Sequence, residues 1–253
     1  MAVVTEDARP RARAARSKIY VGLALMIVAI VLVGFSRSFY GTLVTNASHP
    51  WIIHVHAAVY VGWLALLIAQ TVLAARGDIA THRRVGKFGI AYGALVWILG
   101  LVVSVTMPVI NVHSGLWPME RGEQFLAIPL GDMVLFGAFF GAAIAYRRRP
   151  EIHKRLIILA AVAVMFAAIG RTFTNVAVLL GDPEAPLGGA PARLLLWYSP
   201  VLVAMAHDLV TRRRIHPVYW IGVAAMSVAF LRVPYSQTEH WHAIARTILA
   251  PFL

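Results

Sequence analysis

The chain has no cysteine and few charged residues, and both shortages limit what it can be. Without thiols it cannot form a disulfide, an iron–sulfur cluster or a thiolate zinc site. Only 13% of its 253 residues are charged and 60% are hydrophobic, a balance outside the range of ordinary soluble domains. It also lacks a His-Glu-x-x-His zinc-protease motif and a glycine-rich phosphate loop. The composition indicates a membrane protein and leaves open whether it is an enzyme.

Long apolar runs alternate with short basic segments along the whole chain. The runs lie near residues 19–36, 51–75, 85–110, 125–146, 155–177, 193–211 and 217–234. Most reach or approach the ~20 residues that a helix needs to cross a bilayer. The pattern predicts an all-α fold, an integral membrane bundle of seven transmembrane helices. We expect a basic N-terminal segment at 1–18, a transmembrane domain at 19–235 and an amphipathic interfacial tail at 236–253.

Lys and Arg gather in four clusters, at residues 9–18, 76–87, 147–155 and 212–214. If successive runs cross in opposite directions, these clusters place 17 of the 23 Lys and Arg residues on one side. Basic loops stay in the cytoplasm, so we expect a multi-pass protein of the bacterial inner membrane with a cytoplasmic N-terminus and an outside C-terminus. Anionic lipid headgroups then account for the net charge of +12, and we expect no nucleic-acid partner.

Three hairpins follow the first run, and each turns through a short basic loop that contains a histidine. Two turns match closely, Thr81-His82-Arg83-Arg84-Val85 and Ile152-His153-Lys154-Arg155-Leu156, and they lie 71 residues apart. The third turn, at His216, matches weakly. Repeated hairpins are a common way to build membrane bundles. The match between the turns therefore has two explanations, duplication of a hairpin and chance similarity.

Five ionisable side chains lie inside the apolar runs, where a charge costs a few kcal/mol. They are His54, His56, Asp132, Arg171 and Arg232, all expected within roughly 10 Å of the outer boundary. One interpretation is structural: Asp132 pairs with Arg171 or Arg232, and the arginines otherwise extend to headgroups. The other is an outward-opening pocket in which His54, His56 and Asp132 hold a divalent metal or haem, and the arginines bind an anion.

The two histidines of the second run are not equivalent. Two residues apart on a helix, they point about 200° from each other. The face of His56 continues through Tyr60, Trp63 and Gln70, so we expect this polar and aromatic stripe to face the bundle interior. His54 joins it only if the helix begins late.

A second set of histidines lies at the basic loops. His82 and His153 open their runs alike, and facing histidines on neighbouring helices are how a bundle holds haem b or a metal. His207 and Asp208 lie at the same level and could orient such a ligand. The alternative is that each histidine caps a turn or contacts a lipid phosphate.

A family resemblance rests on the motif residues of this region. The stretch from His56 through Trp63 and Gln70 to His82-Arg-Arg-Val-Gly86, followed by His153-Lys-Arg-Leu156, resembles a widespread group of uncharacterised bacterial polytopic membrane proteins. The resemblance covers residues 50–175. More distantly, the chain is similar to cytochrome oxidase assembly membrane proteins, whose inner turn reads His-Arg-Lys-Leu-Met. The resemblance implies a histidine-bearing helical bundle and carries over no catalytic residue.

Three classes of function follow from these patterns. We favour a protein that binds haem b or a metal and acts in respiratory electron transfer or in assembly of a haem-containing complex. The cofactor-binding candidates are His54, His56, His82, His153, Arg171 and Arg232. The second class is a proton-coupled transporter or lipid- or anion-binding protein that uses Asp132, and the third is a structural subunit of a larger membrane complex.

Overall fold

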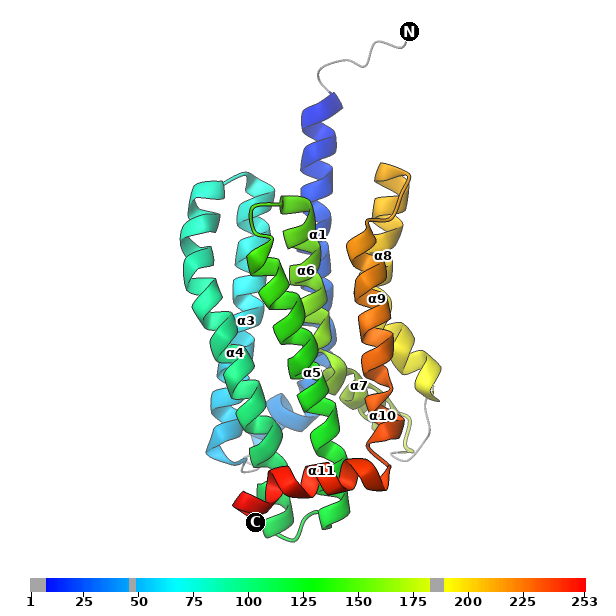
Figure 1. Cartoon of the computed structure of the whole chain (residues 1–253). Coiled ribbons are helices and arrows are strands. Elements are labelled where there is room, and N and C mark those ends of the chain that lie inside the picture. Colours follow the sequence, from blue (N-terminus) through cyan, green and yellow to red (C-terminus); the bar gives the residue numbers. More distant parts are fainter. Residues whose placement is uncertain (1–7, 46–48, 183–188) are drawn as a thin grey trace.

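The computed structural model describes residues 8–45, 49–182 and 189–253, with side chains from residue 18 onward. The described residues form helices and no strand, which confirms the all-α prediction (Figure 1). In chain order the elements are α1 (Ala8–Phe35), the π-helix η1 (Ser36–Tyr40), α2 (Gly41–Thr45), α3 (Trp51–Arg76), α4 (Ile79–His113), α5 (Met119–Ala145), α6 (Pro150–Ala163), α7 (Phe166–Leu179), α8 (Gly189–Arg212), α9 (Pro217–Phe230), α10 (Arg232–Tyr235), α11 (Glu239–Leu249) and the 3-10 helix η2 (Ala250–Phe252).

Six described helical segments are long and apolar enough to cross a membrane. The predicted fifth span, 155–177, is instead broken into α6 and α7, which meet at an angle of 49°. The count is therefore six, or seven if this bent pair is one span. The break has a cause in tertiary packing, because the Trp197 indole N–H of α8 donates to the Val162 carbonyl at 2.9 Å, at the last turn of α6.

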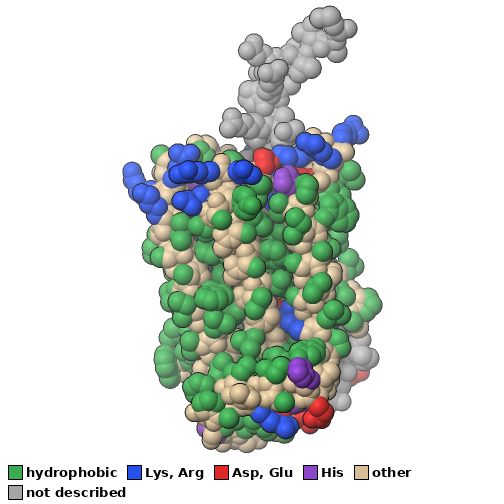
Figure 2. Space-filling view, viewed as in Figure 1, with side chains coloured by type: hydrophobic (Ala, Val, Ile, Leu, Met, Phe, Trp, Pro, Cys, Tyr) green, Lys and Arg blue, Asp and Glu red, His purple; other side chains and the backbone are tan. Residues whose placement is uncertain are grey.

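The long helices lie side by side (Figure 1). The turns at 76–87, 147–155 and 212–214 meet at one end, where Lys and Arg side chains gather on the visible face (Figure 2). We call this the basic end, and the opposite one the α11 end. The first candidate span begins at Lys18, and helix α1 extends before it to Ala8, within the expected N-terminal segment 1–18. Its residues 1–7 lie outside the described part.

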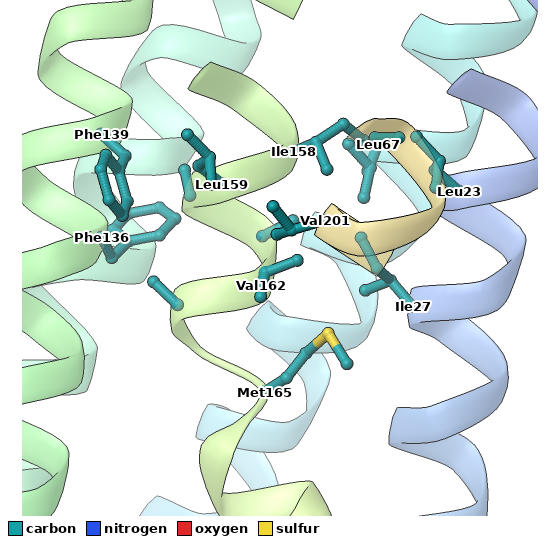
Figure 3. Close-up of a cluster of buried hydrophobic side chains, with 14 of the residues drawn as sticks. Leu23, Ile27, Leu67, Phe136, Phe139, Ile158, Leu159, Val162, Met165 and Val201 are labelled. Carbon is teal, nitrogen blue, oxygen red and sulfur yellow. The ribbon is translucent and has the colours of Figure 1, made fainter. Parts of the chain in front are cut away.

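Helix α6 runs through the middle of the apolar core. Residues 158–163 are each at most 1% exposed, and the core side chains around them come from α1, α3, α5 and α8 (Figure 3). Outward-facing residues are also apolar: Val134, Val210 and Ile221 are 70%, 76% and 66% exposed. A surface of this kind suits lipid, since lipid tails are as apolar as the side chains that meet them.

The tail 236–253 holds α11, which crosses the end of the bundle against α5 (Figure 1). Its buried residues are His242, Ala245 and Leu249. The buried face of this helix thus includes a histidine, whereas Ile244 is 37% exposed. A polar contact with α5, described below, turns this histidine inward.

Candidate functional site

The polar stripe of α3 faces the bundle interior, as its spacing predicts. Trp63 is 4% exposed and packs edge-on against Phe136. His56 Nδ1, Trp63 Nε1 and both amide atoms of Gln70 are buried and have no hydrogen-bond partner among the described residues. Such atoms each cost about 1–3 kcal/mol when nothing pairs with them. The stripe therefore holds most of the unsatisfied polar groups inside this bundle.

His82 lies in the first turn of α4, with its ring against the end of α3. Asp78 caps that turn by accepting the Thr81 N–H at 3.0 Å, and this bond holds the pKa of the Asp78 carboxyl below its usual value. His82 Nδ1 lies 3.2 Å from the Gln70 carbonyl oxygen. A carbonyl only accepts, so Nδ1 carries the proton and Nε2 of the neutral ring keeps its lone pair.

His153 repeats this arrangement one hairpin later. It lies in the first turn of α6, and its Nδ1 donates to the Ala143 carbonyl near the end of α5 at 2.8 Å. Both rings are half-buried. Neither Nε2 makes a hydrogen bond within the described structure. If the histidines only cap turns, this role explains the hydrogen bond at Nδ1 of each ring. It gives no role to Nε2.

Gln70 contacts one member of the histidine pair, which we define as His82 and His153. Its backbone carbonyl holds His82, and its side-chain amide packs against α4, where a Cβ built on Gly86 would lie 3.7 Å from Nε2. The Gln and the His-Arg-x-x-Gly pattern, separated in the sequence, thus form one contact group. A buried amide with neither atom satisfied points to a partner that is not part of the protein chain.

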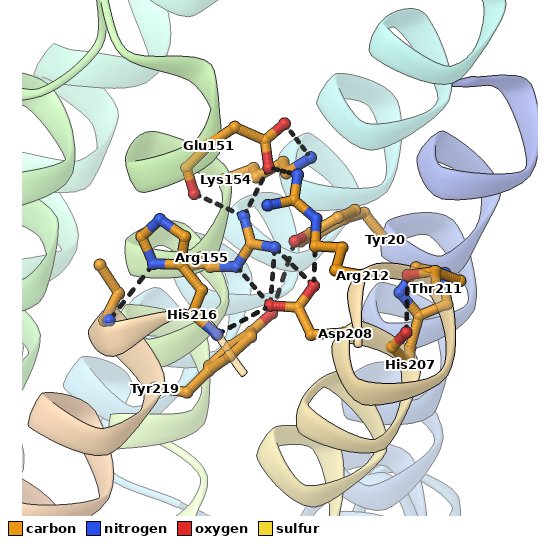
Figure 4. A network of polar contacts seen from close by, with 11 residues as sticks. Tyr20, Glu151, Lys154, Arg155, His207, Asp208, Thr211, Arg212, His216 and Tyr219 are labelled. Carbon is orange, nitrogen blue, oxygen red and sulfur yellow. Dashed lines mark hydrogen bonds and ion pairs between the residues drawn. The ribbon is translucent and has the colours of Figure 1, made fainter. Parts of the chain in front are cut away.

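An ion-pair network fixes the helix that carries His153 (Figure 4). Arg155, 1% exposed, donates to Asp208 through Nε at 3.1 Å and through Nη2 at 2.5 and 2.7 Å. It also donates to the Glu151 carboxylate at 2.8 Å, and Arg212 pairs with Glu151 and Asp208. The Arg155 guanidinium lies 5.4 Å from the Tyr219 ring centroid. Asp208 therefore anchors α6 to α8, and it also accepts the backbone N–H of His216 at the start of α9 at 3.3 Å. The sequence suggested that Asp208 orients a histidine ring, whereas its carboxylate binds arginines.

Toward the α11 end, Asp132 forms an ion pair with Arg232. This pair agrees with the structural interpretation of Asp132, in which the carboxylate pairs with one of the two arginines. Arg232 also stacks over Phe166 and Trp197, at 5.1 and 5.7 Å from their ring centroids. Arg171 does not join this pair.

His54 and His56 lie apart from Asp132 and from each other. The His54 ring packs against Phe39 and His49, with centroids 5.8 and 6.1 Å away. His56 stacks on Tyr60 at 4.1 Å. Within the described ranges, no three His, Cys, Asp or Glu side chains form a group that could hold a metal. The predicted metal set of His54, His56 and Asp132 is thus not brought together.

Sequence reasoning missed Glu123, which is fully buried in α5. Its carboxylate accepts from His242 Nδ1 at 2.5 Å and from Arg246 Nε at 2.6 Å, and its carbonyl accepts from the Trp241 indole at 2.7 Å. One sequence signal was available: His242 and Arg246 are four residues apart, so they share a helix face. Nothing in the sequence identifies an acid 119 residues earlier as their partner.

The histidine pair with Gln70 is the candidate site, because it combines free ligand nitrogens with an unsatisfied amide. Glu151, Lys154, Arg155, Asp208 and Arg212, by contrast, are engaged with one another in the Arg155 network. No protein-family model, curated protein or solved structure matches the chain. The function must therefore be argued from the geometry of this site.

Proposed function

We propose that the protein is a multi-pass protein of the bacterial inner membrane that binds haem b or a divalent metal through His82 and His153. It acts in respiratory electron transfer or in assembly of a haem-containing complex. The observation that carries the proposal is the matched anchoring of the two rings, each with Nδ1 on a backbone carbonyl and Nε2 unused.

The chemistry of the rings supports this ligand set. A histidine that ligates a metal usually donates its other ring N–H to a carbonyl or carboxylate, which fixes the tautomer and raises the basicity of the ligating nitrogen. Both rings have this bond already. Imidazole nitrogens from two different helices are a ligand set that could hold haem b or a divalent metal, and imidazole suits iron, zinc and copper alike.

The expected role of Gln70 differs between the two possible cofactors, a divalent metal and haem b. A divalent ion could be held by the two imidazoles together with the Gln70 amide oxygen, whereas haem b would be held by the two imidazoles alone. The proposed orientation puts the site near the cytoplasmic face, because the basic end remains inside.

The transporter alternative is less well supported. It needs a carboxylate on Asp132 that is free to take up a proton or substrate, and Asp132 is paired with Arg232. A structural subunit would need neither free imidazole nitrogen.

The test is the absorption spectrum and metal content of protein purified in detergent from haem-replete cells. We expect a Soret band or a stoichiometric metal, lost in His82→Ala and in His153→Ala. His240→Ala is the matched control, because that ring is exposed at the α11 end. Folded wild-type protein with neither signal would exclude cofactor binding.

A further inference from the structure

His54 has an imidazole neighbour that the sequence did not suggest. Helix α3 begins at Trp51, at the α11 end of the bundle, and His54 lies in its first turn (Figure 1). The His54 ring centroid lies 6.1 Å from that of His49, which precedes α3. Both rings also pack against Phe39 of η1, whose centroid lies 5.9 Å from His49 and 5.8 Å from His54. We call these three side chains the three-ring cluster.

Thr42 fixes the tautomer of His49. The Thr42 hydroxyl donates its one proton to the Phe39 carbonyl at 2.6 Å. Its oxygen lies 2.8 Å from His49 Nε2 and has no second proton to give, so Nε2 carries a proton and donates it to Thr42. Nδ1 of the neutral His49 ring therefore keeps its lone pair. A histidine that binds a metal usually donates from its other ring nitrogen in this way.

The spacing of the two imidazoles suits one metal ion held between them. A metal–nitrogen bond of about 2.0–2.1 Å puts the ion about 3.2 Å from each ring centroid. Two imidazoles on one ion then have centroids about 5.2 Å apart at a tetrahedral angle and about 6.4 Å apart in a straight line. The 6.1 Å between His49 and His54 lies within this range. Aromatic packing alone permits the same separation, but it assigns no role to the Nδ1 lone pair.

Water can complete the coordination of such an ion. His54 is exposed, and neither of its ring nitrogens forms a hydrogen bond with a described residue. One of these nitrogens carries a lone pair in the neutral ring. Among the described side chains, no further His, Cys, Asp or Glu joins the two histidines to make a group of three. Zinc sites with an open position take water as the remaining ligand.

We propose that His49 and His54 bind a divalent transition-metal ion at the α11 end, with His49 Nδ1 as one ligand and a ring nitrogen of His54 as the other. Imidazole suits Zn²⁺ and Cu²⁺, and the water ligands leave the ion open to exchange. Thr42 is a positioning residue, because it holds His49 in the tautomer that presents Nδ1. The site is separate from the histidine pair and does not depend on what that pair binds.

Calorimetric titration of Zn²⁺ into the full chain tests this site. The protein carries no histidine tag, is purified in detergent and is stripped of metal with a chelator. The ligand variants are His49→Phe and His54→Phe, which keep an aromatic ring in the three-ring cluster. Thr42→Val removes the acceptor of the Nε2–H bond, and Thr42→Ser keeps it. His240→Phe is the matched control, because His240 is an exposed histidine at the same end that also packs on an aromatic ring, Tyr235, at 6.1 Å.

We expect the wild type, Thr42→Ser and His240→Phe to bind this ion alike. Loss of a hydrogen bond that supports a ligand costs roughly 10–100-fold in metal affinity, so Thr42→Val should bind about tenfold more weakly. Each ligand variant should lose the ion or bind it more than about a hundredfold more weakly. His82→Ala should keep the ion, which separates this site from the histidine pair.

Circular dichroism shows whether each variant is folded. If His49→Phe does not fold, His54→Phe decides, because the His54 side chain is exposed. Folded ligand variants that bind Zn²⁺ as tightly and in the same number as the wild type would overturn the proposal. Folded wild-type protein without saturable Zn²⁺ binding would overturn it as well.

Discussion

The buried pair of Arg155 and Asp208 gives the sharpest quantitative prediction. Asp208→Asn keeps the side-chain volume and removes the charge, so the guanidinium of Arg155, 1% exposed, loses its bidentate partner. Breaking a buried pair costs about 3–5 kcal/mol because the remaining charge is left uncompensated. Glu151 still accepts from Arg155 at 2.8 Å, so we expect the lower end, about 3 kcal/mol or roughly a hundredfold in the folding equilibrium.

The assay is reversible unfolding in mixed detergent micelles, and the loss of the helical circular dichroism signal measures the unfolded fraction. Glu151→Gln is the control, since its side chain is 46% exposed and should cost less than about 1 kcal/mol. The double variant Arg155→Met/Asp208→Leu should recover most of the lost stability, because apolar residues of similar volume can replace a buried ion pair. An Asp208→Asn protein as stable as the wild type would refute the reasoning.

Three further predictions concern other parts of the bundle. Glu123→Gln should destabilise the docking of α11 by about 1.5–3 kcal/mol, since a buried carboxylate loses its charge-assisted bonds; faster tryptic cleavage after Arg246 would show it, and an unchanged rate would contradict it. Gly34→Ala should cost about 1–3 kcal/mol through overpacking against Ala168, whereas Gly22→Ala, with open space around it, should be neutral or stabilising in the same unfolding assay. Burial lowers the pKa of His216, whose Nδ1 caps α9 by accepting the Val218 N–H, so this cap contributes above about pH 6.5 and is lost on acidification; a loss of roughly 0.5–1 kcal/mol between pH 7 and 5 should vanish in His216→Asn, and an equal loss in that variant would contradict the assignment.

Local patterns in the sequence predicted much of this structure. Apolar run lengths gave the helices, because a helix that spans a bilayer needs a fixed number of apolar residues. The break at Val164 and Met165 was not predictable, since neither residue disfavours a helix; the cause is a hydrogen bond from Trp197, 35 residues away along the chain. The periodicity of α3 placed Trp63 inside and separated His54 from His56, as helical geometry requires.

The pairing of the polar side chains could not be predicted from the sequence. Asp132 had two candidate arginines at equal expected depth, and only the packing of α10 on α5 selects Arg232. Glu123 lies just before the apolar run at 125–146, and its partners lie on the tail assigned to the lipid interface. Likewise, the turn residues identified His82 and His153 as equivalent, but only the structure shows the Nδ1 bonds that leave each Nε2 free. Partner choice depends on tertiary packing, which residue spacing does not encode.

The account rests on both free Nε2 atoms serving one cofactor. Electron paramagnetic resonance of the oxidised protein, purified from haem-replete cells, tests this most directly when wild type, His82→Ala and His153→Ala are compared. We predict a low-spin bis-imidazole iron signal in the wild type and its loss in each variant, or, for a divalent metal, a bound paramagnetic substitute such as Cu²⁺ whose nitrogen couplings diminish in each variant. Signals that neither substitution alters, or no bound centre in folded wild-type protein, would contradict the account.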